Sequence, residues 1–218
     1  LGDVRDASRL LLAFNNVDIV IHAAALKQVD TAEYNPSEFI KTNILGAQNI
    51  IEAAFYNNVS KIIALSTDKA SSPINLYGAT KLCSDKLFTS ANHFLGQKKF
   101  SVVRYGNVLE SRGSILPLFR FQAELKSHLT VTHRNMTRFI MTLEESVDLI
   151  ISTLLGAKSG ELWLPKLKSM KIIDLAEIFS EQYSKPIKIV GIRPGEKLHE
   201  DLISYSESMR VRVKNSIY

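Results

Sequence analysis

Tyr77 and Lys81 are four residues apart, and a phenol and an ammonium at this spacing could act together in proton transfer. Residues at positions i and i+4 lie on the same face of a helix. An ammonium beside a phenol favours the phenolate, and so lowers a pKa that is ordinarily about 10. A phenolate can take the proton from a hydroxyl group while hydride leaves the same carbon. Taken alone, however, a tyrosine and a lysine at this spacing are common, and an ordinary pair on a helix surface is the better interpretation.

A run of polar residues ahead of this pair changes the interpretation. The apolar run 61–67 predicts a buried strand, and Asp68 and Lys69 follow it directly. Parallel sheets bind ligands at the carboxyl ends of their strands. We therefore expect Thr67, Asp68 and Lys69 next to the helix that carries Tyr77. The alternative for Asp68 and Lys69 is a solvated turn before the proline-containing loop that follows.

The first half of the sequence predicts a scaffold that would hold these residues in place. Short apolar runs predict buried strands, and longer amphipathic stretches between them predict helices. The strands are expected at 18–25, 61–67 and 100–105, and the helices at 37–56 and 77–95, the second closed by Gly96. This alternation of strands and helices predicts an α/β fold with a doubly wound parallel sheet.

The second half of the sequence predicts a smaller lobe that does not repeat the first. Helices are expected at 115–125, 143–155 and 172–183, and strands at 162–165 and 187–192. The strand at 162–165 contains a proline, which places it at the edge of a sheet.

Composition narrows the class of protein. Of the 218 residues, 45% are hydrophobic and 22% are charged, which is typical of a soluble globular chain. The net charge of +5 comes largely from scattered basic residues, and this disfavours nucleic acid as a partner. No apolar run approaches the roughly 18 residues of a membrane span, and no signal-peptide pattern is present, so the cytoplasm is the default location. The chain does not begin with Met, so we expect that a segment before it is missing.

Cysteine and histidine usage adds further expectations. The single cysteine, Cys83, excludes an internal disulfide, and its place in a helical stretch predicts a core or half-buried residue. The five histidines show no metal-ligand spacing, so no metal is expected. His22 is expected to be a packed residue at the end of a strand.

Together these features resemble the extended short-chain dehydrogenases/reductases that modify nucleotide sugars, which have a Rossmann-like sheet. Tyr77 and Lys81 match the Tyr-x-x-x-Lys pair of that superfamily, and Thr67 stands where it keeps a serine or threonine. Asn43 matches its asparagine on the preceding helix. The run 22–25 matches the strand end that lies along the cofactor.

Within that superfamily the chain is similar to the inverting UDP-N-acetylglucosamine 4,6-dehydratases, which make the first intermediate toward pseudaminic acid in flagellin glycosylation. Retaining dehydratases have a glutamate at the position of Lys69. Related capsule-type dehydratases share the lysine, but many depart from tyrosine at the position of Tyr77. The matching runs cover almost the whole chain in order: 24–29, 65–70, 75–82, 104–108, 111–114, 136–139 and 193–198.

The resemblance implies an internal redox elimination. Tyr77, assisted by Lys81, would remove the C4 hydroxyl proton as hydride passes to a nicotinamide, and Thr67 would hydrogen-bond the same hydroxyl. Lys69 would then remove the C5 proton, and Asp68 would protonate the departing C6 hydroxyl, although these two neighbours can exchange roles. Hydride would return to C6 and a proton would reach C5 from the opposite face, so the cofactor is not consumed.

The resemblance also implies the ligands and the residues that bind them. The implied substrate is UDP-N-acetylglucosamine and the implied cofactor is NADP, with NAD as the alternative. The residues implied in cofactor binding are Asp3, Val4, Ala23, Lys27, Ser66, Tyr77 and Lys81. Those implied in substrate binding are Lys27, Asn107, Val108, Arg112, Thr132, Arg138, Arg193 and Glu196. For Arg138 a structural ion pair is an equal alternative.

The domain organisation follows from the same resemblance. We interpret residues 1–110 as a partial NAD(P)-binding domain, and residues 111–218 as mainly a substrate-binding lobe that is interleaved with it. The glycine-rich turn of the dinucleotide site is missing from the sequence, and we expect it about 60 residues upstream of Leu1. A homo-oligomer is expected, since the resembled enzymes self-associate.

Two other functions stay open. One is a UDP-sugar epimerase of the same superfamily, although Lys69 beside Asp68 argues against a simple 4-epimerase, which needs no acid and base for C5 and C6. The other is a non-catalytic nucleotide-sugar-binding module. The missing glycine-rich turn favours the module, and the intact set of Thr67, Asp68, Lys69, Tyr77 and Lys81 opposes it.

Overall fold

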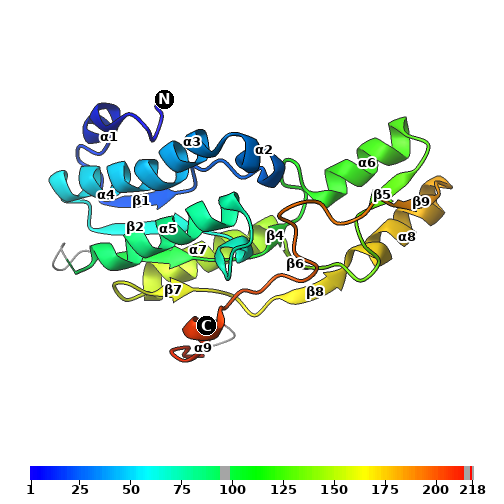
Figure 1. The fold of residues 1–218 in the computed structure, drawn as a ribbon. Coiled ribbons are helices and arrows are strands. Elements are labelled where there is room, and N and C mark those ends of the chain that lie inside the picture. Colours follow the sequence, from blue (N-terminus) through cyan, green and yellow to red (C-terminus); the bar gives the residue numbers. More distant parts are fainter. Residues whose placement is uncertain (94–98, 214–216, 218) are drawn as a thin grey trace.

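A four-stranded parallel sheet forms the centre of the larger part of the molecule (Figure 1). The computed structural model describes residues 1–93, 99–213 and 217. The order of the strands in the sheet is β1 (Ile19–His22), β2 (Lys61–Leu65), β3 (Lys99–Val103) and β7 (Leu162–Trp163). The three strands predicted in the first half are confirmed, each ending two or three residues before its predicted end, and β7 is the predicted edge strand.

Helices cover both faces of this sheet. On one face, Ile62 and Phe100 pack against α1 (Ala7–Ala13), α4 (Gly46–Tyr56) and α5 (Leu76–Ala91). On the other face, Ile63 and Val103 pack against Leu149 of α7 (Leu143–Gly156). Alternate residues of a strand point to opposite faces, so each strand contributes to two cores. This arrangement confirms the predicted α/β fold with a doubly wound parallel sheet.

The helical stretch ahead of β2 is interrupted by a π-helical turn. After α2 (Val29–Tyr34) come α3 (Pro36–Phe39), the π turn η1 (Ile40–Leu45) and α4. The last three occupy the stretch where we expected one regular helix from 37 to 56. Asn43 in the π turn is buried and bonds Leu26 twice, since Oδ1 accepts from its N–H at 2.9 Å and Nδ2 donates to its carbonyl at 2.9 Å. Nδ2 also donates to Thr80 Oγ1 at 3.0 Å. Asn43 therefore joins the loop after β1 to α5, and π turns are frequent at functional sites.

The smaller lobe lies at the far end of the molecule from β1 (Figure 1). Phe119 of α6 (Ile115–Leu125) and Ala176 of α8 (Ile172–Tyr183) are fully buried in its core. These two helices have the predicted bounds. The lobe's strands are β4 (Asn107–Val108), β6 (Thr137–Met141) and β8 (Lys168–Lys171) in one sheet, and β5 (Leu129–Val131) and β9 (Ile187–Ile189) in another.

Several details differ from the sequence-based expectations. The elements α1, α2, β4, β5, β6 and β8 were not predicted, nor was the short C-terminal helix α9 (Tyr205–Ser208). Cys83 is exposed, so its prediction as a core or half-buried residue is wrong. The predicted helix end at Leu95 and Gly96 lies outside the described residues. None of the helices in the described part of the chain is long and apolar enough to cross a membrane.

The closest approach of α5 to the turn after β2 generates a first prediction. A Cβ added to Gly78 would overlap the Lys69 carbonyl oxygen and lie 3.1 Å from Pro73 Cβ. Gly78→Ala should therefore lower the free energy of unfolding by about 1–3 kcal/mol, because overlap outweighs the helix preference for alanine. Urea unfolding measures this, with Ser90→Ala at an exposed position of the same helix as the control. A Gly78→Ala protein more stable than the parent would contradict the close approach.

Candidate active site

A short 3₁₀ turn at the end of β2 carries the predicted acid and base. Thr67 caps this turn, η2 (Asp68–Ala70), and its hydroxyl donates to Asp68 Oδ1 at 2.9 Å. The Asp68 N–H donates to the Tyr105 carbonyl at 2.9 Å, beyond the end of β3. Asp68 is 0% exposed. The alternative of a solvated turn is therefore wrong for Asp68.

Lys69 lies between two buried carboxylates. Its Nζ is 3.0 Å from Asp68 Oδ1 and 3.5 Å from Glu200 Oε1. The Glu200 side chain is 3% exposed, and that of Lys69 is 19% exposed. The ammonium of Lys197 lies 4.0 Å from Glu200 Oε2 and donates to the Ser71 carbonyl at 2.8 Å. Asp68, Lys69, Glu200 and Lys197 thus form a cluster of alternating negative and positive charges at the turn.

The first turns of α5 bring the phenol and the second lysine to the same place. Asn75 caps this helix by accepting from the Gly78 N–H at 2.7 Å. Tyr77 and Lys81 are both buried. Thr67 lies close enough to Tyr77 to affect the pKa of its phenol, and Lys81 Nζ donates to the Leu65 carbonyl at 2.7 Å. The structure therefore brings together Thr67, Asp68, Lys69, Tyr77 and Lys81, as the sequence predicts.

The electrostatics of the phenol differ from the expectation. Burial raises the pKa of Tyr77 above its usual value, and the interaction with the Thr67 hydroxyl lowers it by less. The charge of Asp68 also raises the pKa of Tyr77. Burial lowers the pKa of Lys81, because it disfavours the charged ammonium, and the nearby carboxylate of Asp85 raises it again in part. The side chains around Tyr77 therefore raise its pKa, whereas we expected Lys81 to lower it.

A buried ionic network lies behind Lys81, and sequence reasoning missed it. Asp85, one turn further along α5, accepts from Arg104 Nη2 at 3.0 Å. The fully buried Arg104 also donates to both carboxylate oxygens of Glu207, at 2.9 and 3.0 Å, and to the Leu202 carbonyl at 2.9 Å. The sequence contained one signal, the position of Asp85 at i+4 from Lys81.

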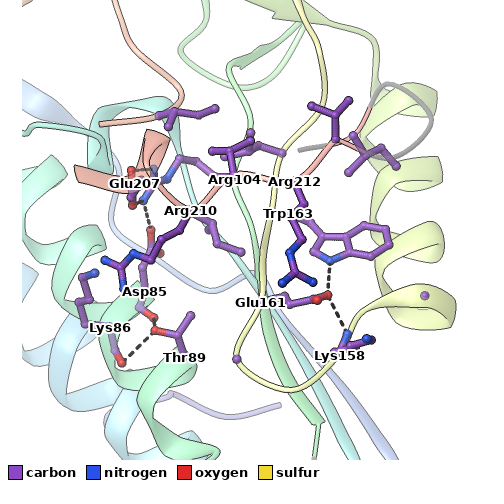
Figure 2. A pocket seen from close by; sticks show the side chains of 18 of the residues that line it. Asp85, Lys86, Thr89, Arg104, Lys158, Glu161, Trp163, Glu207, Arg210 and Arg212 are labelled. Carbon is purple, nitrogen blue, oxygen red and sulfur yellow. Dashed lines mark hydrogen bonds and ion pairs between the residues drawn. The ribbon is translucent and has the colours of Figure 1, made fainter. Parts of the chain in front are cut away.

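Asp85, Arg104 and Glu207 line a cavity of about 830 Å³ (Figure 2). Trp163 lines it as well, and its indole N–H donates to Glu161 at 2.8 Å. The residues that line this cavity do not include Thr67, Asp68, Lys69, Tyr77 or Lys81. The cavity is therefore distinct from the place where the predicted chemistry would occur.

The residues implied in cofactor binding fall in two places. Ala23 and Lys27 are exposed just beyond the carboxyl end of β1, and Ser66 is buried beyond β2. Asp3 is exposed near the N-terminus and pairs with Arg5 at 2.7 Å, which lowers the pKa of Asp3 to about 2. Val4 packs against the core that includes α4. His22 is buried beside Phe88, which confirms it as a packed residue, and burial lowers its pKa to about 3.

The residues implied in substrate binding are spread over the lobe. Asn107 and Val108 are half-buried in β4, and Arg112 is exposed. The buried Thr132 donates to Met136 Sδ at 3.0 Å, inside the lobe and not in the catalytic cluster. Of the residues in this part of the lobe, Arg112 is the most accessible to a ligand, and Asn107 is half-buried.

Two arginines implied in substrate binding lie at the segment 193–200: Arg138 contacts it, and Arg193 is its first residue. The buried Arg138 donates to the carbonyls of Thr137 at 2.7 Å and Leu198 at 3.3 Å. Within residues 1–93, 99–213 and 217, Arg138 is held by these carbonyls and not by a carboxylate. Arg193 pairs with Asp30 of α2 at 3.3 Å, and its Nε lies 4.0 Å from Glu196.

The family of the chain follows from this sheet, this cluster and a comparison with known proteins. The family described as polysaccharide biosynthesis protein matches residues 1–218, and the chain belongs to it. The chain is 54% identical over 211 residues to the UDP-N-acetylglucosamine 4,6-dehydratase (inverting) of Campylobacter jejuni, a match that covers 95% of the chain and 63% of that protein. The resemblance predicted from the motifs is thereby confirmed.

Two further proteins are similar to the chain over nearly its whole length. The UDP-glucose 4-epimerase of Rickettsia akari is 44% identical over 213 residues, which cover 96% of this chain and 62% of that protein. The crystal structure of Pen from Bacillus thuringiensis superposes with a TM-score of 0.95 at 40% identity, covering 100% of this chain and 68% of that one. The chain spans slightly less than two thirds of the length of the two curated relatives.

The Arg104 network generates a second prediction. Burial raises the pKa of Glu207, but Arg104 and the hydrogen bonds from Ser204 outweigh it and lower the pKa to about 2 from 4.5. Glu207 therefore stabilises the fold above pH 4.5 and loses that effect as the pH falls toward 2. Glu207→Gln should lower the free energy of unfolding at pH 7 by about 1–3 kcal/mol, less than for a fully buried pair because Glu207 is partly exposed. The difference from the parent should shrink at about pH 3.5.

Urea unfolding followed through the fluorescence of Trp163, the single tryptophan, measures this difference. Glu177→Gln, at an exposed position of α8, is the matched control and should change little at either pH. Equal destabilisation by Glu207→Gln at both pH values would show that its charge does not contribute.

Proposed function

We propose that this chain is the catalytic part of an inverting UDP-N-acetylglucosamine 4,6-dehydratase. The observation that carries the proposal is the buried cluster itself, in which Asp68 and Lys69 lie against Tyr77 and Thr67. An oxidation at C4 alone needs only the phenol and its neighbours. The additional acid and base are what elimination across C5 and C6 requires. The identity of 54% to a relative of that name supports the same conclusion.

The residues at the ends of β1 and β2 fit a nicotinamide cofactor, with NADP as the proposed form. Ala23 to Ala25 are small and exposed there, so a flat ring system can approach the backbone. One N–H of the Lys81 ammonium donates to the Leu65 carbonyl. The ammonium has two further N–H donors, which could bind the hydroxyls of a ribose. When bound, an oxidised nicotinamide supplies a hydride acceptor and a positive charge that lowers the pKa of a nearby phenol.

The residues of the cluster take the following roles in the proposed mechanism. Tyr77 Oη accepts the proton of the C4 hydroxyl, and Thr67 holds that hydroxyl in place. Lys69 Nζ removes the C5 proton, which the new C4 ketone has made acidic, and Asp68 protonates the departing C6 hydroxyl. A proton then reaches C5 from the opposite face and inverts it. Burial of the cluster strengthens each of these interactions because water does not compete.

The substrate, location and assembly belong to the same proposal. Asn107, Arg112 and Arg193 are the side chains proposed to hold the UDP moiety, since an arginine fork binds phosphate in two places. We place the enzyme in the cytoplasm, as a homo-oligomer, with its product entering pseudaminic acid biosynthesis for flagellin glycosylation.

A UDP-sugar 4-epimerase is the second candidate, because the Rickettsia relative carries that name. Epimerisation at C4 needs oxidation and reduction at one carbon. It gives no role to Lys69 or to the buried carboxylates around it. The cluster therefore favours dehydration, and the two reactions differ in the mass of the product.

The proposal is tested by incubation with UDP-N-acetylglucosamine and NADP⁺ in heavy water. The assay uses both the 218-residue chain and a version extended at its ends to the length of the curated relatives. We expect loss of one water, solvent deuterium at C5 and an inverted C5 centre, as read by mass spectrometry and NMR. A product of unchanged mass with inverted C4 would establish the epimerase, and no reaction by either protein would overturn both.

Lys69→Ala tests the base within that reaction. We expect C5 deuterium incorporation to fall at least about 100-fold, because general base catalysis contributes factors of this size. Formation of reduced nicotinamide should continue, since Tyr77 is untouched. Lys188→Ala, at an exposed position of β9, is the control. Normal C5 exchange by Lys69→Ala would assign the base to another group.

A further inference from the structure

The segment 193–200 connects the lobe to the catalytic cluster. It leaves β9 at the far end of the molecule and runs back toward the sheet before α9 (Figure 1). The carbonyl of Gly195 accepts from Asn75 Nδ2 at 2.7 Å, so the residue that caps α5 also holds this segment. Lys197 fixes it to Ser71, next to η2. The segment is thereby anchored on both elements that carry the cluster.

Glu200 is the residue of this segment that reaches Lys69. Its Oε1 lies 3.5 Å from Lys69 Nζ. Its Oε2 is buried and has no hydrogen-bond partner among the described residues, although the Lys197 ammonium lies 4.0 Å away. Burying a carboxylate is costly unless it is paired, and an unbonded buried oxygen adds to the cost. An oxygen in this position is also one that can accept a proton.

We propose that Glu200 is a positioning residue that holds Lys69 and takes the proton that Lys69 must lose before it can act as a base. This inference rests on the proposed dehydratase function. An N–H bond of the Lys69 ammonium breaks and an O–H bond forms on Glu200, so the pair passes from ammonium and carboxylate to amine and carboxylic acid without a change of total charge. The free electron pair of Lys69 then takes the C5 proton.

The protons balance over one turnover. Asp68 enters the turnover with a proton on Oδ2, the oxygen that has no partner among the described residues, so it cannot also take the proton of Lys69. After elimination Lys69 carries the C5 proton, Glu200 carries the first proton, and Asp68 has given its proton to the leaving hydroxyl. Tyr77 carries the proton of the C4 hydroxyl and releases it to solvent. Lys69 passes its proton to Asp68 across the 3.0 Å contact, and Glu200 then returns its proton to Lys69. The proton that reaches C5 from the opposite face comes from solvent. No oxidant or reductant beyond the internal hydride is needed.

Glu200→Gln separates this role from a structural one. The glutamine keeps the size of the side chain and an oxygen that can accept from Lys69, but it cannot take a proton. In the protein form that proves active, we expect dehydration and C5 exchange to fall about 10- to 100-fold, as for other groups that act through a catalytic neighbour. Formation of reduced nicotinamide and the melting temperature should stay near those of the parent. Glu200→Asp should recover part of the lost exchange.

The matched control is Asp201→Asn, the same chemical change at the next residue, which is exposed. Unchanged C5 exchange in Glu200→Gln would overturn the proposal, as would a parallel fall in C4 oxidation and C5 exchange. A lowered melting temperature with full C5 exchange would assign Glu200 a structural role only. An inactive parent protein would overturn the proposed function and this inference together, whereas an active parent with an unaffected variant overturns only the role of Glu200.

Discussion

The site depends on a carboxylate that is fully removed from water at the end of β2. Asp68 is 0% exposed, and its N–H extends the contact between β2 and β3 by bonding the Tyr105 carbonyl. A buried carboxylate costs several kcal/mol unless charged or hydrogen-bonding groups surround it. Thr67 and Lys69 supply those groups, and both bond the same oxygen of Asp68. The turn that satisfies this carboxylate is therefore also the turn that presents the acid and the base.

Each lysine of the cluster has a buried carboxylate near it in addition to Asp68. Asp85 lies one helical turn behind Lys81 and is itself held by Arg104. Glu200 lies behind Lys69 and comes from the segment between the lobe and α9. Arg104 and Glu207 connect the first of these pairs to α9, the helix that follows that segment. The C-terminal part of the chain therefore contributes charges to both lysines, to Lys69 directly through Glu200 and to Lys81 indirectly through Glu207, Arg104 and Asp85.

The sequence predicted the elements and residues whose signals are local. Strong apolar periodicity placed α6 and α8 at their observed bounds. The spacing of Tyr77 and Lys81, and the position of Asp68 after a buried strand, predicted the cluster. The two-residue strand β4 carries too little pattern to be recognised. Glu200 and Arg104 were missed because their partners lie far along the chain. The pKa of Tyr77 shifts opposite to expectation because i, i+4 spacing does not reveal how deeply a side chain is buried.

A crystal structure of the Lys69→Ala protein with UDP-N-acetylglucosamine and NADP⁺ bound would show directly whether the turn after β2 is where the substrate reacts. We expect the C4 hydroxyl within hydrogen-bond distance of Tyr77 and Thr67, the C6 hydroxyl beside Asp68, and the C5 hydrogen directed at the space that the Lys69 side chain fills. A hexose whose C5 and C6 face away from this turn, or that lies in the cavity lined by Arg104 and Trp163, would contradict this expectation.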